Sequence, residues 1–228
     1  MTSSVTTGII VPLYSYPGAG WATLVEAKTA HPHLPMIAII NPSSGPGLSR
    51  DSKYADGIKN LQGAGIAVLG YISTAYSARP EASIIADTDA YERMYPVEGI
   101  FFDEMSNVPG RAADYSALVE HARSIGFSLT VGNPGASISP LLTSGMDCLV
   151  VYENAGLPSI PTLTSRTDGL SRGQSAFISY STTLPGASYL SSASQRVAYV
   201  YATDRSMPNP YSMLPSYLMA LLDALERA

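Results

Sequence analysis

Residues 99–104 form the stretch Gly99-Ile100-Phe101-Phe102-Asp103-Glu104, an apolar run that ends in two adjacent carboxylic acids. Ile and Phe favour strands, and a short continuous apolar run is typical of a strand that is buried on both faces. An unpaired charge is costly inside a core. We therefore predict a buried strand that carries Asp103 and Glu104 at its carboxyl end, where water can reach them.

Seven further runs of the same kind flank this one, and most are continuously apolar rather than alternating. Together with residues 99–103 these runs predict eight strands. The other seven are residues 8–13, 36–41, 67–73, 128–132, 147–153, 175–180 and 197–203. Continuous apolar runs favour parallel strands covered on both faces.

Stretches with helical spacing separate most of these strands. One begins at Trp21, a second spans residues 115–125 and a third spans residues 214–225. The weakest predicted helices are 134–145 and 157–173, which are rich in Ser, Pro and Gly. Eight strand–helix units predict an α/β fold, a single (β/α)8 TIM-type barrel occupying residues 1–228 as one domain. An open doubly wound sheet is the alternative.

Composition excludes several classes of function. The 228 residues are 46% hydrophobic, 14% charged and carry a net charge of −5, which argues against nucleic acid as a partner. No apolar stretch approaches the roughly 18–20 residues of a membrane span. The N-terminal residues show no signal-peptide pattern. The single cysteine, Cys148, excludes an internal disulfide and is predicted to be a buried thiol.

Carboxylates mark the candidate catalytic residues, because barrel enzymes place their chemistry at the carboxyl ends of the strands. Asp103 and Glu104 end the fourth strand and Glu153 ends the sixth. Glycoside hydrolysis requires such a pair of acids. Strand alternation places Asp103 and Glu104 on opposite faces unless the chain bends. The alternative is that these acids cap helices or pair with Arg79 or Arg111.

Tyrosines and amides crowd the same strand ends, and the chain has 15 Tyr against four Phe. An aromatic ring can stack on a sugar and its hydroxyl can form hydrogen bonds. Ordinary packing at the rim is the alternative for each tyrosine. The candidate substrate-binding residues are Tyr14, Tyr16, Asn41, Tyr71, Tyr76, Asn133, Tyr152, Tyr180 and Asp204.

Neither a metal nor a cofactor is expected. His31 and His33 lie in a His-Pro-His turn with no third ligand nearby. The loop 42–47, Pro-Ser-Ser-Gly-Pro-Gly, lacks the Gly-Lys-Ser/Thr of a phosphate-binding loop.

Four strings of this sequence together resemble the spherulin-4, or spherulation-specific, family. They are residues 39–47 (Ile-Ile-Asn-Pro-Ser-Ser-Gly-Pro-Gly), 70–76 (Gly-Tyr-Ile-Ser-Thr-Ala-Tyr), 99–104 and 152–153 (Tyr-Glu). The family includes fungal glycoside hydrolases that cut galactosaminogalactan. The resemblance implies a (β/α)8 barrel, an endo-acting hydrolase of α-1,4-linked N-acetylgalactosamine, and an acidic trio at Asp103, Glu104 and Glu153. It also implies an extracellular protein, although the absence of a signal peptide keeps a cytoplasmic location open.

The hypothesis from sequence is therefore a monomeric, metal-independent endo-glycosidase whose partner is an amino-sugar polysaccharide. Asp103 acts as nucleophile or base, Glu153 as the general acid with a raised pKa, and Glu104 orients the substrate or tunes Asp103. Attack by the substrate's own N-acetyl oxygen is left open, as is the choice between acetylated and deacetylated substrate. Two alternatives are a non-catalytic carbohydrate-binding wall or spore-coat protein and a barrel enzyme acting on a small molecule.

Overall fold

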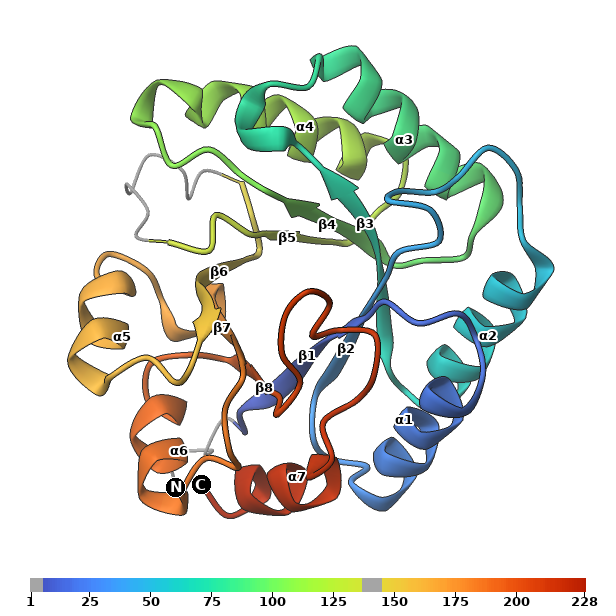
Figure 1. Cartoon of the computed structure of the whole chain (residues 1–228). Helices are drawn as coiled ribbons and strands as arrows, with labels where there is room; N and C mark the ends of the chain where they lie inside the picture. The colour runs from blue at the N-terminus through green and yellow to red at the C-terminus, as the bar shows by residue number, and fades with distance from the viewer. Residues whose placement is uncertain (1–5, 137–144) are drawn as a thin grey trace.

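Eight parallel strands close into a barrel in the computed structural model, which describes residues 6–136 and 145–228. Each strand pairs with the next along the chain, and the last pairs with the first through Gly8 and Tyr199. Figure 1 looks along the barrel and shows the helices as an outer ring. The strands are β1 (Gly8–Leu13), β2 (Met36–Ile40), β3 (Ala67–Ser73), β4 (Gly99–Asp103), β5 (Leu129–Gly132), β6 (Cys148–Ala155), β7 (Ser175–Tyr180) and β8 (Tyr199–Ala202).

Helices follow most strands and cover the outside of the barrel. They are α1 (Ala19–Ala30), α2 (Ser52–Gly63), α3 (Glu81–Met94), α4 (Ala112–Ser124), α5 (Ile160–Arg166), α6 (Ala187–Ser194) and α7 (Leu218–Glu226), with the 3-10 turns η1 (Ala75–Ser77), η2 (Pro109–Arg111) and η4 (Arg172–Gln174). The predicted (β/α)8 barrel is confirmed, with strand bounds within two residues of those observed. Of the two weak helical stretches, the second contains the short helix α5. Most of the first, residues 137–144, lies outside the described residues.

The strand β4 shows how the sequence builds the core. A side chain at Gly99 would place its Cβ 1.8 Å from the carbonyl oxygen of Leu129, so the close approach of β5 requires glycine here. Phe101 and Phe102 are both fully buried on opposite faces, which stabilises the fold by about 1.5–3 kcal/mol for each ring. Phe101 stacks on Tyr71 of β3 at 6.4 Å between ring centroids. Asp103 lies on the same inner face, one pleat nearer the carboxyl end.

Strand β6 contains an irregularity that matters for the site. Its register to β7 shifts between Val150 and Tyr152, as in a β-bulge that inserts Val151. Beyond this point Tyr152 and Glu153 face opposite ways. Cys148, at the start of the strand, is buried as predicted. Within residues 6–136 and 145–228, no helix is both long enough and apolar enough to span a bilayer.

Candidate functional site

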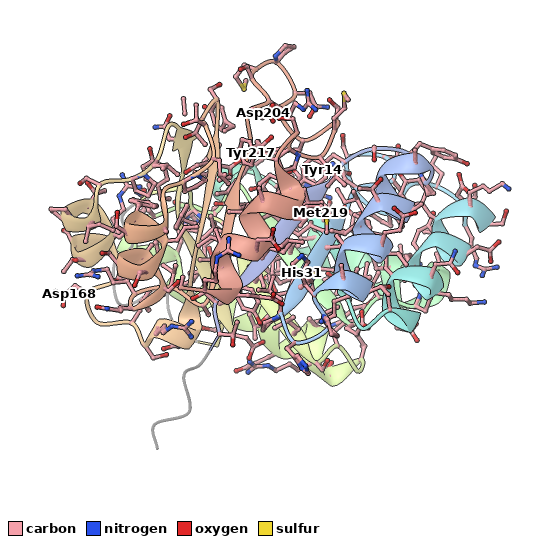
Figure 2. The ribbon with its side chains drawn as sticks, turned by 90° about the horizontal axis from the view of Figure 1, so that it is seen from below. Tyr14, His31, Asp168, Asp204, Tyr217 and Met219 are labelled. Atoms are coloured by element: carbon pink, nitrogen blue, oxygen red, sulfur yellow. The ribbon has the colours of Figure 1, made fainter. Side chains whose placement is uncertain are left out.

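A cavity of about 550 Å³ opens at the end of the barrel where the strands have their carboxyl ends. Its walls come from the ends of several strands and from residues 207–211, which belong to the connection between β8 and α7. In Figure 1 that connection, in red, lies over the opening of the barrel. Figure 2 shows Asp204, Tyr217 and Tyr14 toward this end, with His31 and Asp168 toward the other. The cavity is lined by all three acids that the sequence singled out.

Asn133, directly after β5, connects two of these acids. Its side-chain nitrogen donates one hydrogen bond to Asp103, at 2.8 Å, and another to Glu153. Asn133 is 4% exposed, and its Oδ1 is buried with no hydrogen-bond partner among the described residues. The two carboxylates come from β4 and β6, with β5 between them, so the intervening strand supplies the amide that holds them together. Asn133 was predicted to bind substrate, and the structure places it between the two acids.

Glu104 reaches the same cavity because the chain bends after β4. Glu104 has φ of 52°, a left-handed conformation that is uncommon for residues other than glycine. Its carboxylate accepts a hydrogen bond from the Ser73 hydroxyl. The bend overcomes the alternation that would otherwise separate Asp103 from Glu104, so both acids line one cavity.

The adjoining turn after β3 is also strained, and it supports the bend. Ala75, Tyr76 and Ser77 have φ of 46°, 54° and 68° in succession. The buried hydroxyl of Thr74 donates to the carbonyl oxygens of Asp103, at 3.0 Å, and Glu104, at 2.7 Å. Such conformations persist only where surrounding contacts over-determine them, and they cluster at functional sites.

Burial raises the pKa of Asp103 to about 6, and the neighbouring charge of Glu153 acts in the same direction. Hydrogen bonds from the Glu104 backbone, the Tyr71 hydroxyl and Asn133 oppose the rise. Asp103 therefore holds a proton at mildly acidic pH, when most aspartates have lost theirs. The raised pKa of Asp103 was not predicted from the sequence.

Tyr211 is a site residue that sequence reasoning missed. Its hydroxyl donates a short hydrogen bond to the other oxygen of Glu153, Oε1. It lies well past the end of β8, in the segment Met207-Pro208-Asn209-Pro210-Tyr211, which lines the cavity. The available indication was an aromatic residue in a Pro-rich connection at the functional end of the barrel, where enzymes of this fold build their sites.

Four of the predicted tyrosines lie at the site. Tyr14, Tyr76 and Tyr180 line the cavity, whereas Tyr71 lies beneath it and hydrogen-bonds to Asp103. Tyr14 packs edge-on against Tyr71, with 5.5 Å between the ring centroids. Tyr76 is 66% exposed, so its ring is free to contact a ligand.

The other predicted binding residues do not line the cavity, because their side chains have local partners. Tyr16 donates to Asp51 and packs against Tyr54 on the α2 side. Asn41 accepts a hydrogen bond from the Gly45 backbone within the loop after β2. Asp204 accepts from the Ser216 backbone N–H.

Tyr152 is the fourth of these residues. Its ring lies under Arg166 of α5, whose guanidinium carbon is 5.1 Å from the ring centroid. Its hydroxyl donates to backbone carbonyls at Ala155 and Gly156. Tyr152 is therefore part of the contact between β6 and its helix.

The two arginines named as alternative partners of the acids pair elsewhere. Arg79 forms an ion pair with Asp87 at 2.7 Å, and Arg111 with Asp114 at 3.2 Å. Within the part of the chain that the structure describes, neither Lys nor Arg lines the cavity. Across the described residues, no group of three or more His, Cys, Asp or Glu side chains is arranged to hold a metal ion.

Comparisons with known proteins agree with this architecture. The chain is 37% identical over 158 residues to spherulin-4 of Physarum polycephalum; the match covers 68% of this chain and 47% of that protein, so the chain spans about half of its length. Among solved structures, Sph3 from Aspergillus clavatus in complex with GalNAc superposes with a TM-score of 0.84 at 23% identity, covering 96% of this chain and 97% of that one. A deoxyribose phosphate aldolase from Aeropyrum pernix gives 0.61 at 11% identity, covering 98% and 90%.

At such identities the structural matches show the fold alone, and the aldolase illustrates that this barrel carries different chemistries. The family to which this chain belongs is shown by its amino-acid sequence. The model of spherulation-specific family 4 matches residues 8–225, and this chain therefore belongs to that family.

Proposed function

We propose that this protein is an endo-acting glycoside hydrolase that cleaves α-1,4-linked N-acetylgalactosamine or galactosamine polysaccharide. The observation that carries the proposal is the Asn133 nitrogen that hydrogen-bonds to both Asp103 and Glu153. It holds two carboxylates at one cavity, with Glu104 beside them, and two carboxyl groups are what glycoside hydrolysis requires.

We assign the roles of the two acids from their environments. Asp103 has its pKa raised to about 6 by burial and by the charge of Glu153, which suits the group that protonates the leaving oxygen. Glu153 accepts hydrogen bonds from Asn133 and Tyr211, and donors of this kind favour the ionised carboxylate. We therefore assign Asp103 as the acid and Glu153 as the nucleophile, the reverse of the assignment made from sequence.

The spacing of the pair supports a retaining reaction. Because one nitrogen contacts both carboxylates, their nearest oxygens lie within two hydrogen-bond lengths, less than about 6 Å. Retaining enzymes have their carboxyl groups about 5–5.5 Å apart, whereas inverting enzymes leave about 6.5–9.5 Å for a water molecule. In an α-linked substrate the 2-acetamido group is cis to the leaving oxygen, so its carbonyl cannot attack from the opposite face. An enzyme carboxylate is then required.

The reaction follows in two balanced steps. Asp103 gives its proton to the glycosidic oxygen while a Glu153 oxygen bonds to the anomeric carbon, and the C–O bond to the leaving sugar breaks. Asp103, now ionised, takes a proton from water as the water oxygen attacks the anomeric carbon and releases Glu153. Glu104, held by Ser73, lines the same cavity and binds hydroxyl or amino groups of the sugar.

Features of the cavity favour a sugar polymer over other substrates of barrel enzymes. Tyr76 and Tyr180 offer ring faces to sugar C–H groups. No lysine among the described residues lines the cavity, so the Schiff-base chemistry of some aldolases has no nucleophile from that part of the chain. One chain supplies all the residues that the proposed reaction uses. A polymeric substrate of this kind is met outside the cell, and we place the action there.

Incubation with purified α-1,4-linked galactosaminoglycans, acetylated and deacetylated, tests the proposal by mass spectrometry of released oligosaccharides. Wild type is expected to release oligosaccharides, and Asp103→Asn and Glu153→Gln to lose at least about 10³-fold in rate. Asp168→Asn is the matched control, since that exposed acid lies toward the opposite end of the barrel (Figure 2). Equal release by all four proteins would contradict the assignment. Binding without release would favour a carbohydrate-binding wall protein.

A further inference from the structure

We propose that Tyr211 is a positioning residue whose hydroxyl holds the Glu153 carboxylate ionised and in place opposite Asp103. The inference rests on the proposed function and deepens it. Glu153 is held from both sides, since its Oε2 accepts from Asn133 and its Oε1 accepts from Tyr211. Each oxygen thus has a donor, and the carboxylate is not free to rotate toward Asp103.

Several contacts fix Tyr211 itself. Its carbonyl oxygen accepts a hydrogen bond from the Tyr14 backbone N–H at 3.2 Å, which ties the β8–α7 connection to the end of β1. Its ring packs edge-on against Tyr14, with 5.7 Å between centroids, and against Tyr201 of β8 at 6.3 Å. Asn209 accepts a hydrogen bond from the Tyr211 backbone N–H at 3.2 Å. The hydroxyl is therefore delivered by a rigid ring.

The groups facing Glu153 show why a neutral donor matters. Asp103 faces it from β4 with a like charge, and none of the ion pairs among the described residues includes Glu153. Glu104 is a further acid on the same cavity. Four phenols also interact with Glu153, and their pKa values lie above the usual range, chiefly because of burial: Tyr14, Tyr71, Tyr76 and Tyr211. These phenols stay protonated, so Tyr211 remains a donor throughout the working pH range. It does not serve as a base.

The position of the hydroxyl also contributes to which acid holds the proton. Asp103 and Glu153 are close enough to titrate as a pair, and a donor on one partner places the shared proton on the other. Asp103 itself accepts hydrogen bonds from the Glu104 backbone, Tyr71 and Asn133, which favour its ionised form. The Tyr211 hydroxyl offsets them by favouring the ionised form of Glu153, so that burial leaves the proton on Asp103, the group that must donate it. Without the hydroxyl, part of the population carries the proton on Glu153 and cannot react.

Tyr211→Phe removes the hydroxyl and leaves the ring contacts and the backbone hydrogen bonds. We expect kcat on the galactosaminoglycan to fall on the order of 10- to 100-fold, with KM changed less than about threefold. The acidic limb of the kcat profile moves to higher pH, because a carboxylate that loses a donor binds its proton more tightly. Tyr189→Phe is the matched control: its hydroxyl bonds the Pro158 carbonyl at 2.9 Å, away from the cavity. Neither its rate nor its pH profile should move.

A measurement that needs no turnover separates this inference from the proposed function. Carbon-13 NMR of protein labelled at glutamate Cδ, with Glu153→Gln to assign the resonance, follows protonation of Glu153 directly. In Tyr211→Phe the midpoint is expected to rise by about half a pH unit or more relative to wild type. An unchanged midpoint overturns the role of Tyr211, whatever the rates, and so does a raised midpoint with an unchanged pH–rate profile. If wild type cleaves no galactosaminoglycan, the proposed function fails while the NMR result still decides what Tyr211 does.

Discussion

Asp103 and Glu153 are hydrogen-bonded to the same atom, the side-chain nitrogen of Asn133, although 50 residues separate them in the chain. The arrangement follows from the order of the barrel, because β5 runs between β4 and β6 and Asn133 directly follows β5. A neutral amide at this point satisfies two acids and adds no charge that would hold both of them ionised.

Replacing the amide tests that arrangement. Asn133→Asp puts a third acid between the two and removes both donated hydrogen bonds, so we expect kcat/KM to fall on the order of 10²–10³-fold. Asn133→Ala, which removes the donor without adding charge, should lose less. Initial rates measure both effects. Asn60→Asp, at an exposed position on α2, is the control for the same chemical change. Equal losses in Asn133→Asp and Asn133→Ala would show that charge plays no part.

Asp103 is predicted to reduce the stability of the folded state as pH rises. Its folded pKa of about 6 lies above the ordinary 3.8, so the native state binds this proton more tightly than the unfolded chain does. That stabilisation is fully present below about pH 4 and is lost as pH rises through 6. Asp103→Asn does not titrate, so its stability relative to wild type should rise between pH 4 and 8, by about 2–3 kcal/mol.

Denaturant unfolding of both proteins at several pH values provides the measurement. A difference in unfolding free energy that stays constant from pH 4 to 8 would contradict the raised pKa. The result also bears on activity, because residues that lower the stability of the folded state are commonly kept where function requires them.

The pH dependence of activity should also depend on the proton held by Asp103. If Asp103 is the general acid, kcat/KM falls above about pH 6, as the free enzyme loses the proton that the leaving oxygen needs. A substrate with an activated aryl leaving group needs little protonation. Asp103→Asn should therefore retain much more activity on an aryl glycoside of an α-1,4-linked oligosaccharide than on the polymer, whereas Glu153→Gln should fail on both. The opposite pattern would restore the roles assigned from sequence.

The strands and the three acids were predictable because both depend on local pattern. A run such as residues 99–103 has no polar side chain until its last position, and the barrel rule then places that position at the functional end. The bend at Glu104 was not predictable, because a left-handed glutamate is unfavourable locally. It depends on Thr74, which the sequence does not connect with Glu104.

Two of the differences between the expected and the observed lining of the cavity have different origins. Tyr152 precedes Glu153, so alternation along β6 already places its ring toward α5; the same argument was applied to Asp103 and Glu104 but not here. Tyr211 was missed because no strand ends near it, and its position depends on how the β8–α7 connection folds back to β1. Loops carry function in this fold, but their paths are determined by long-range contacts.

The exposed tyrosines were interpreted either as sugar-stacking residues or as ordinary packing at the rim, and Tyr76 and Tyr16 allow the two interpretations to be compared. Both follow a strand and both are exposed, at 66% and 59%, so the sequence treats them alike. Tyr76 lines the cavity, held by the left-handed turn after β3, whereas Tyr16 bonds to Asp51 on the α2 side.

If the Tyr76 ring stacks on sugar, Tyr76→Ala should raise KM on the order of 10-fold, matching about 1–2 kcal/mol of lost contact. Tyr76→Phe keeps the ring and should change KM little. Tyr16→Ala removes an equally exposed ring outside the cavity, and kinetics on the polymer should not distinguish it from wild type. Equal effects of the two alanine substitutions would mean that the substrate extends over the β1 loop as well, and that the cavity alone does not define the binding site.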